Sequence, residues 1–151
     1  MATLVAIGGI AAVASPASAS SDISDTGGRV ARIALHQRGD QYQLGAIGPS
    51  RFDCSGLVKY AYNKAGVGNR IGGGHSARGM YYWARRHGLT SRSHPRIGDV
   101  VIYGHGSHAG IYVGKGKVVH ALNRRVDVVV TGLHELSTPF TAFIHTRIPH
   151  G

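Results

Sequence analysis

The 151-residue sequence contains a single cysteine, Cys54, whose setting is typical of a nucleophile. After it, apolar residues recur at helical spacing up to a glycine that is typical of a helix end: Leu57, Val58, Ala61, Ala65 and Gly66. Cys54 is therefore predicted in the first helical turn, where unpaired backbone N–H groups and the helix dipole favour a thiolate. A pKa of about 6 would ionise ~90% of the thiol at pH 7, against ~3% at the ordinary value of about 8.5. The alternative is a small, buried, unreactive cysteine.

The second half of the chain predicts a sheet that could carry the base for this thiol. From residue 99 onward, β-branched and alternating segments indicate antiparallel strands at residues 100–103, 109–113, 117–122, 126–130 and 141–147. The first half instead predicts helices at residues 28–38, 54–65 and 76–87, joined by glycine-rich loops. The sequence thus predicts an α+β fold, in which N-terminal helices carrying the nucleophile pack on a C-terminal antiparallel sheet.

The turn between the second and third predicted strands brings two histidines together. A three-residue loop at residues 114–116 would pair Val113 with Lys117. His108 and His120 would then be diagonal neighbours on one face, about 7–8 Å apart at the backbone. Such a pair could supply a base for the thiol and a polar group that orients the base.

Other histidines offer alternatives to this pair. His105 is the competing base, since it lies three residues from His108 in a glycine-rich turn. A zinc site made of His105, His108 and His120 is a further alternative, although no carboxylate or second cysteine lies at ligand spacing. Six more histidines receive a surface or structural interpretation: His36, His87, His94, His134, His145 and His150.

The N-terminal segment, residues 1–19, is predicted to be an export signal. It contains no charged side chain, is rich in small and apolar residues, and ends in Ala17-Ser18-Ala19, which is typical of a cleavage site. The basic start of such a signal is missing, and a membrane anchor is the alternative, although glycine and proline weaken the segment as a span. We therefore expect a secreted protein, extracellular or associated with the cell wall.

The remainder of the chain is expected to be a short linker at residues 20–27 and one domain at residues 28–151. The formal net charge of +10 belongs entirely to this remainder and favours anionic partners. Basic residues are spread without a run, so no nucleic acid is expected, and anionic wall polymers or lipid headgroups fit better. A solubilising surface charge is the alternative. One cysteine allows no internal disulfide, and we expect a monomer.

Four stretches of the chain, in this order, resemble the consecutive blocks of the NlpC-type cell-wall cysteine peptidases, the family also named for a sixty-kilodalton listerial protein. They are RFDCSGLVKYAY at residues 51–62, IGDVV at 97–101, SHAGIYVG at 107–114 and VHA at 119–121. One block is short enough to recur by chance, whereas four blocks in the right order make the match specific. The similarity spans roughly residues 28–147.

The resemblance implies a compact papain-like fold with a hydrolytic site. Cys54 would attack an amide, His108 would be the base, and His120 would be the third polar residue that orients it. The implied substrates are peptidoglycan stem peptides, commonly cut between D-isoglutamate and the following diamino acid. That reaction needs no metal and no organic cofactor.

The resemblance also implies three residues around the nucleophile. Tyr42 would help to line the oxyanion site, Asp53 would contact substrate, and Ser55 would flank the nucleophile in the cleft. The chain departs from the family pattern at residues 43–46 and at the triple glycine 72–74. A cysteine amidase or acyltransferase acting on other wall or lipid amides, and an idle basic wall-binding module, are the alternative functions.

Overall fold

The structure is a computed structural model that describes Gly9 and residues 25–151. Apart from Gly9, the predicted export signal at residues 1–19 lies outside the described residues, as does most of the predicted linker. Within the described part of the chain, no helix has the length and apolar character needed to cross a membrane.

The described residues form three α-helices and a six-stranded antiparallel sheet, which confirms the predicted α+β fold. The helices are α2 (Thr26–His36), α3 (Cys54–Lys64) and α4 (Ala77–Arg86), with a 3-10 turn η1 (Gly68–Arg70). The sheet has the strand order β3-β8-β4-β5-β6-β7. Its strands are β3 (Thr90–Ser91), β4 (Val100–Tyr103), β5 (His108–Gly114), β6 (Lys117–Asn123), β7 (Asp127–Gly132) and β8 (Phe140–Ile144). A separate parallel pair consists of β1 (Gln41–Tyr42) and β2 (Arg51–Phe52).

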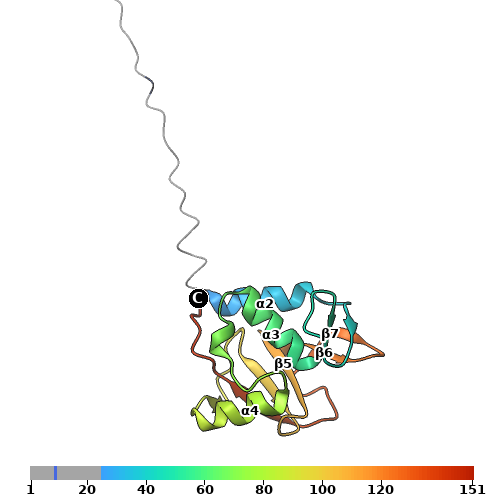
Figure 1. The fold of residues 1–151 in the computed structure, drawn as a ribbon. Helices are drawn as coiled ribbons and strands as arrows, with labels where there is room; N and C mark the ends of the chain where they lie inside the picture. Colours follow the sequence, from blue (N-terminus) through green and yellow to red (C-terminus); the bar gives the residue numbers. More distant parts are fainter. Residues whose placement is uncertain (1–8, 10–24) are drawn as a thin grey trace, which may run out of the picture.

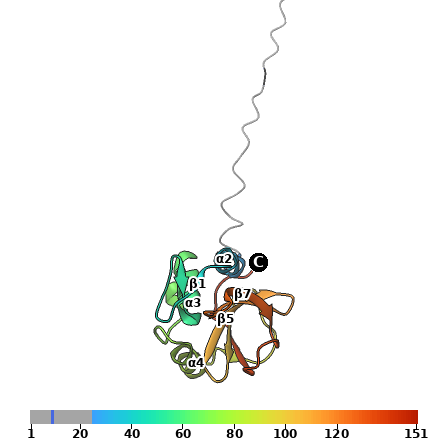
Figure 2. The same cartoon turned by 90° about the vertical axis from the view of Figure 1, so that its right-hand side faces the viewer.

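The main core lies between the helices and one face of this curved sheet. Helices α2 and α3 lie side by side over β5 and β6, and α4 lies at another end of the sheet (Figures 1 and 2). Central strand β4 is buried on both faces, because Val100 and Ile102 join the main core while Val101 and Tyr103 join a smaller apolar cluster behind the sheet. The helices therefore pack on a sheet whose central strand is buried on both faces.

Each α-helix begins after a side chain whose oxygen accepts a hydrogen bond from a backbone N–H three residues on. These caps are Asp25, Asp53 and Ser76, with distances of 2.9, 2.7 and 2.9 Å. Because Asp25 caps α2, this helix starts two residues earlier than predicted. Thr26 and Gly27, which were expected in the linker, are therefore part of the helix.

The hairpin between β5 and β6 has the predicted offset but a different turn. Ile111 pairs with Val119, as the expected offset requires. However, Gly114 rather than Val113 pairs with Lys117, and a bulge accommodates the extra residue in β5. The turn thus has two residues rather than three, and both have positive φ, at 52° and 67°, as in tight hairpin turns.

The last strand, β8, ends at Ile144 instead of the predicted residue 147. Ile144 pairs with Thr90 and with Val100, which are the first residues of the two neighbouring strands. Beyond Ile144, neither neighbour continues, so the ladder ends. Strands β1, β2 and β3 have two residues each and were not predicted, because such short segments show no period.

Candidate active site

Cys54 is the first residue of α3 and lines a cavity of about 260 Å³. The preceding loop is held directly against this helix start, since the N–H of Asp53 donates to the carbonyl of Ala46 at 3.0 Å. A Cβ on Gly56 would collide with that same carbonyl oxygen, so only glycine allows the approach. The Asp-Cys-Ser-Gly sequence thus fixes both the helix start and the wall beside the sulfur.

His108 and His120 lie next to each other on the sheet. The Nε2 atom of His108 is 2.9 Å from the Nδ1 atom of His120, and His120 is fully buried. A Cβ on Gly110 would lie 3.1 Å from the Cβ of His120 and 2.6 Å from a methyl carbon of Val118, so the glycine leaves room for the second imidazole. The diagonal neighbours predicted from the hairpin are therefore hydrogen-bonded partners.

The thiol of Cys54 lies beside the start of β5. The backbone N–H of Ala109 reaches the sulfur, and Ala109 directly follows His108. Helix α3, which begins at Cys54, packs on β5, which begins at His108. Nε2 of His108 is engaged with His120, which leaves Nδ1 as the other ring nitrogen.

The electrostatics of the site favour neutral partners. Burial raises the pKa of the Cys54 thiol, and the N–H groups of Ala109, Ser55 and Cys54 itself only partly oppose this effect. Burial and the neighbouring His120 lower the pKa of His108 to about 3, and burial lowers the pKa of His120 to about 4. The thiolate expected from the helix start alone is therefore wrong for the free protein, because burial outweighs the helix terminus.

Tyr42 is held near the start of α3 by the short parallel pair. Tyr42 pairs with Phe52, two residues before Cys54. Burial raises the pKa of the Tyr42 hydroxyl, and the charges of Cys54 and Asp53 raise it further, which places all three groups in one electrostatic environment. Tyr42 also lines the cavity that contains the sulfur.

The carboxylate of Asp53 is bonded to four protein groups. Its Oδ1 accepts from the N–H of Gly56 at 2.7 Å and from the hydroxyl of Ser55 at 3.2 Å, and lies 2.9 Å from Nε2 of His75. Its Oδ2 accepts from the N–H of Gly45 at 2.7 Å. Asp53 therefore ties the helix start, the preceding loop and His75 into one arrangement, and both Asp53 and Ser55 line the cavity.

His75 is a cavity residue that the sequence reasoning did not single out. It lies directly before Ser76, the cap of α4, and follows the triple glycine 72–74. A Cβ on Gly73 would collide with the backbone of Gly79, so this loop approaches α4 closely and directs His75 toward Asp53. The glycines were visible in the sequence, but nothing in them indicated which cavity the loop would line.

Arginines flank the cavity on two sides. Arg78 lines it directly. A second pocket, of about 490 Å³, adjoins it at Tyr42 and is lined by Asn123, Arg124 and Arg125. The two pockets share Tyr42, and arginine side chains line both of them.

His105 lies apart from the thiol. It lines a different pocket with Tyr81 and Thr141, and its ring lies 6.5 Å from the ring of Tyr81. Across residues 25–151, no group of three or more His, Cys, Asp or Glu side chains is arranged to hold a metal ion. The alternative zinc site of His105, His108 and His120 is not formed.

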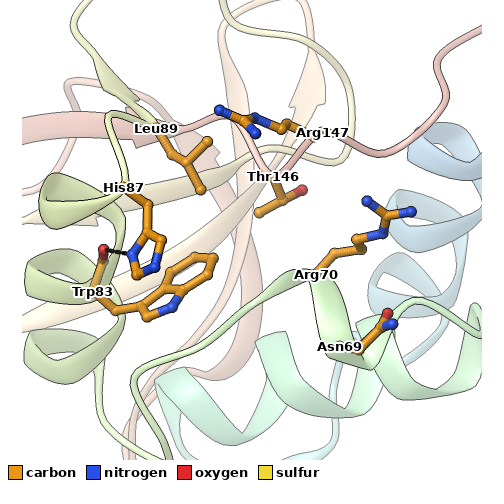
Figure 3. A pocket seen from close by; sticks show the side chains of 7 residues that line it. All are labelled: Asn69, Arg70, Trp83, His87, Leu89, Thr146 and Arg147. Carbon is orange, nitrogen blue, oxygen red and sulfur yellow. Dashed lines mark hydrogen bonds between the residues drawn. The ribbon is translucent and has the colours of Figure 1, made fainter.

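A further cavity, of about 380 Å³, lies toward the opposite end of α4 (Figure 3). Trp83 and His87 form one wall, and Asn69 and Arg70 lie across from them. This cavity shares no lining residue with the cavity of Cys54 and contains no cysteine. The cavity of Cys54 instead lies at the start of α4, where Ser76, Ala77 and Arg78 line it.

A helix-borne cysteine packed against sheet-borne histidines defines a papain-like α+β fold. The chain belongs to the NlpC/P60 family, whose model matches residues 39–143. This confirms the resemblance seen in the four sequence blocks.

Three relatives illustrate the match. A probable endopeptidase of Corynebacterium glutamicum is 35% identical over 115 residues, which cover 75% of this chain and 51% of that protein. The peptidoglycan hydrolase RipB of Mycobacterium tuberculosis superposes with a TM-score of 0.65 at 25% identity, over 90% of this chain and 73% of that one. NlpC1 of Trichomonas vaginalis gives a TM-score of 0.68 at 26% identity, over 82% of this chain and 45% of that one. The chain thus spans about half the length of its corynebacterial relative.

Proposed function

We propose that this protein is a secreted cysteine endopeptidase that hydrolyses an amide bond in peptidoglycan stem peptides, between D-isoglutamate and the following diamino acid. The observation that carries the proposal is the position of Cys54, the only cysteine of the chain, at a helix start beside the His108–His120 pair. The names of the relatives support the substrate class, since they include an endopeptidase and a peptidoglycan hydrolase.

In the proposed reaction, Sγ of Cys54 attacks the carbonyl carbon while Nδ1 of His108 takes the thiol proton. The C–N bond then breaks as the leaving nitrogen receives this proton from His108. Nδ1 of His108 then deprotonates a water molecule. This water hydrolyses the thioester, and the proton returns to Sγ to restore the thiol. His120 holds the ring of His108 in place throughout.

Donors for the developing oxyanion are available at the helix start. The backbone N–H of Cys54 lies at the positive end of α3, where four N–H groups lack helical partners. We assign the hydroxyl of Tyr42 as a second donor, since it lies in the same cavity. Its raised pKa keeps this hydroxyl protonated at neutral pH, as a donor must be.

The two pockets that share Tyr42 fit an anionic peptide. Arg78 in one pocket, and Arg124 and Arg125 in the other, form no ion pair within the described residues. Stem peptides carry free carboxylates next to the scissile bond, and guanidinium groups bind carboxylates strongly. A stem peptide bound across both pockets would bring its scissile carbonyl to the pocket that Cys54 lines.

Secretion and wall association are part of the same proposal. They are supported by the uncharged segment that ends in Ala17-Ser18-Ala19 and by the net charge of +10, which favours anionic wall polymers as a second partner. The substrate would be reached outside the cell.

Product analysis on a defined muropeptide tests the function. The purified protein should convert a soluble disaccharide-tetrapeptide into two fragments whose masses sum to that of the substrate plus one water, and Cys54→Ala should produce none. Transfer of the acyl group to an added amine in place of water would identify an acyltransferase. Sedimentation with purified wall without any cleavage would identify an idle binding module and overturn the proposal.

A further inference from the structure

A diagonal row of three side chains crosses three adjacent strands behind the thiol. His108 in β5 contacts His120 in β6, and His120 faces Val129 in β7. Thr131 lies two residues beyond Val129 and therefore on the same face as His120. Its Oγ1 is 3.0 Å from the Nε2 atom of His120 and 3.1 Å from the carbonyl oxygen of Gly132.

The direction of these hydrogen bonds follows from what each group can do. A carbonyl oxygen only accepts, so the single proton of the Thr131 hydroxyl points to Gly132. The same hydroxyl must then accept at its oxygen, and the donor is Nε2–H of His120. A neutral His120 protonated at Nε2 has a lone pair at Nδ1, which accepts Nε2–H of His108. This leaves the Nδ1 lone pair of His108 free.

We propose that Thr131 is a positioning residue that selects the tautomer of His120 and, through it, the tautomer in which His108 can act as a base. The proposal rests on the proposed function of the Cys54 site. Thr131 touches neither substrate nor sulfur, and acts only through the two imidazoles.

Thr131 is needed as a fourth residue after Cys54, His108 and His120, because the residue that orients His108 is itself a histidine. A carboxylate in the place of His120 would always accept from His108, whereas a neutral imidazole either accepts or donates at Nδ1, depending on where its proton is. His120 is fully buried, and within the described residues Thr131 is the only hydrogen-bond partner of its Nε2. If Nε2 of His120 lost its proton, Nδ1 would donate to His108 and the base would be blocked.

The tautomers can be read directly by two-bond 1H–15N correlation spectra of the histidine rings, without substrate. In the wild-type protein, His120 and His108 should both carry their proton on Nε2. In Thr131→Val, which keeps the shape but removes the hydroxyl, His120 should populate both tautomers, and Thr131→Ser should restore the single form. A wild-type His120 protonated at Nδ1, or a Thr131→Val spectrum identical to that of the wild type, would overturn the proposal.

Kinetics provide a second readout. Thr131→Val should lower kcat about 2- to 10-fold, the worth of one neutral hydrogen bond, with KM unchanged, while Thr131→Ser stays close to the wild type. In a His120→Asp background, Thr131→Val should cost nothing further, because a carboxylate needs no tautomer selection. An equal loss in both backgrounds would show a merely structural role. The wild-type protein could show the expected tautomers and yet cleave no substrate. In that case the hydrogen-bond direction stands, and only the proposed function is rejected.

Discussion

His145 and His108 each contact a fully buried partner, and the two partners differ in kind. His145 lies 2.7 Å from the carboxylate of Asp99, whereas His108 lies 2.9 Å from a second imidazole, that of His120. The histidine–carboxylate pair is the one familiar from hydrolytic triads, yet His145 faces a pocket without a cysteine. The His108–His120 pair contains no acid.

The difference shows what the two arrangements are for. His145 satisfies Oδ2 of the fully buried Asp99 with a hydrogen bond, and this polar contact stabilises the fold. Burial and His120 instead lower the pKa of His108 to about 3, which keeps this ring neutral at pH 7. The first pair thus satisfies a buried carboxylate, whereas the second holds a neutral imidazole next to Ala109, whose N–H reaches the sulfur of Cys54.

The largest expected effect is on rate. His108→Asn should lose on the order of 10²–10⁴ in kcat/KM on a soluble muropeptide, because the general base is removed. His105→Asn is the matched control and should stay within a few fold; asparagine tolerates its positive φ of 53°. A larger loss at position 105 than at 108 would break the assignment of the base.

The opposite pattern is expected for the other pair. His145→Asn removes one of two hydrogen bonds to Oδ2 of Asp99, whose carboxylate is fully buried, and should lower the free energy of unfolding by about 1–3 kcal/mol. The turnover of folded protein should not change. In urea titrations, the exposed control His94→Asn should stay within about 0.5 kcal/mol of wild type. Loss of turnover without loss of stability in His145→Asn would remove the distinction between the two pairs.

The smallest effect on cleavage is expected from screening the net positive charge of the chain. If the net charge of +10 holds the protein on anionic wall polymers, association with intact wall should fall steeply near ~0.3 M salt, where exposed charges are screened beyond about 6 Å. Cleavage of a small soluble muropeptide should change much less, since the contacts of Cys54 and His108 are short. Sedimentation and product analysis across a salt series measure the two; wall binding that ignores salt would exclude a tethering role.

Local signals were sufficient to predict several parts of this site. The apolar spacing and the terminal glycine placed Cys54 at the start of its helix, and the hairpin offset brought His108 and His120 together. The turn was one residue too long because a β-bulge is invisible in a pattern of alternating residues. The pairing of β5 with β6 nevertheless has the predicted offset, because the extra residue in the bulge compensates for the shorter turn.

What the sequence could not provide depends on contacts distant along the chain. His75 reaches Asp53 across 22 positions through a loop whose glycines specify no direction. The pKa of Cys54 was predicted in the wrong direction, because a helix start is a local feature, whereas the burial that raises this pKa comes from packing on β5. Thr131 was missed for the same reason, since its role depends on the register of a third strand.

The central claim is that Cys54 and His108 rest as a neutral thiol and a neutral imidazole, and that the proton moves only during attack. Titration of the thiolate by its ultraviolet absorbance, with Cys54→Ala as the blank, tests this claim most directly. Because burial raises the pKa of Cys54, the thiol keeps its proton to higher pH, and the midpoint should lie above the ordinary value of about 8.5. A midpoint below about 7 would mean a resting thiolate–imidazolium pair and would contradict the account.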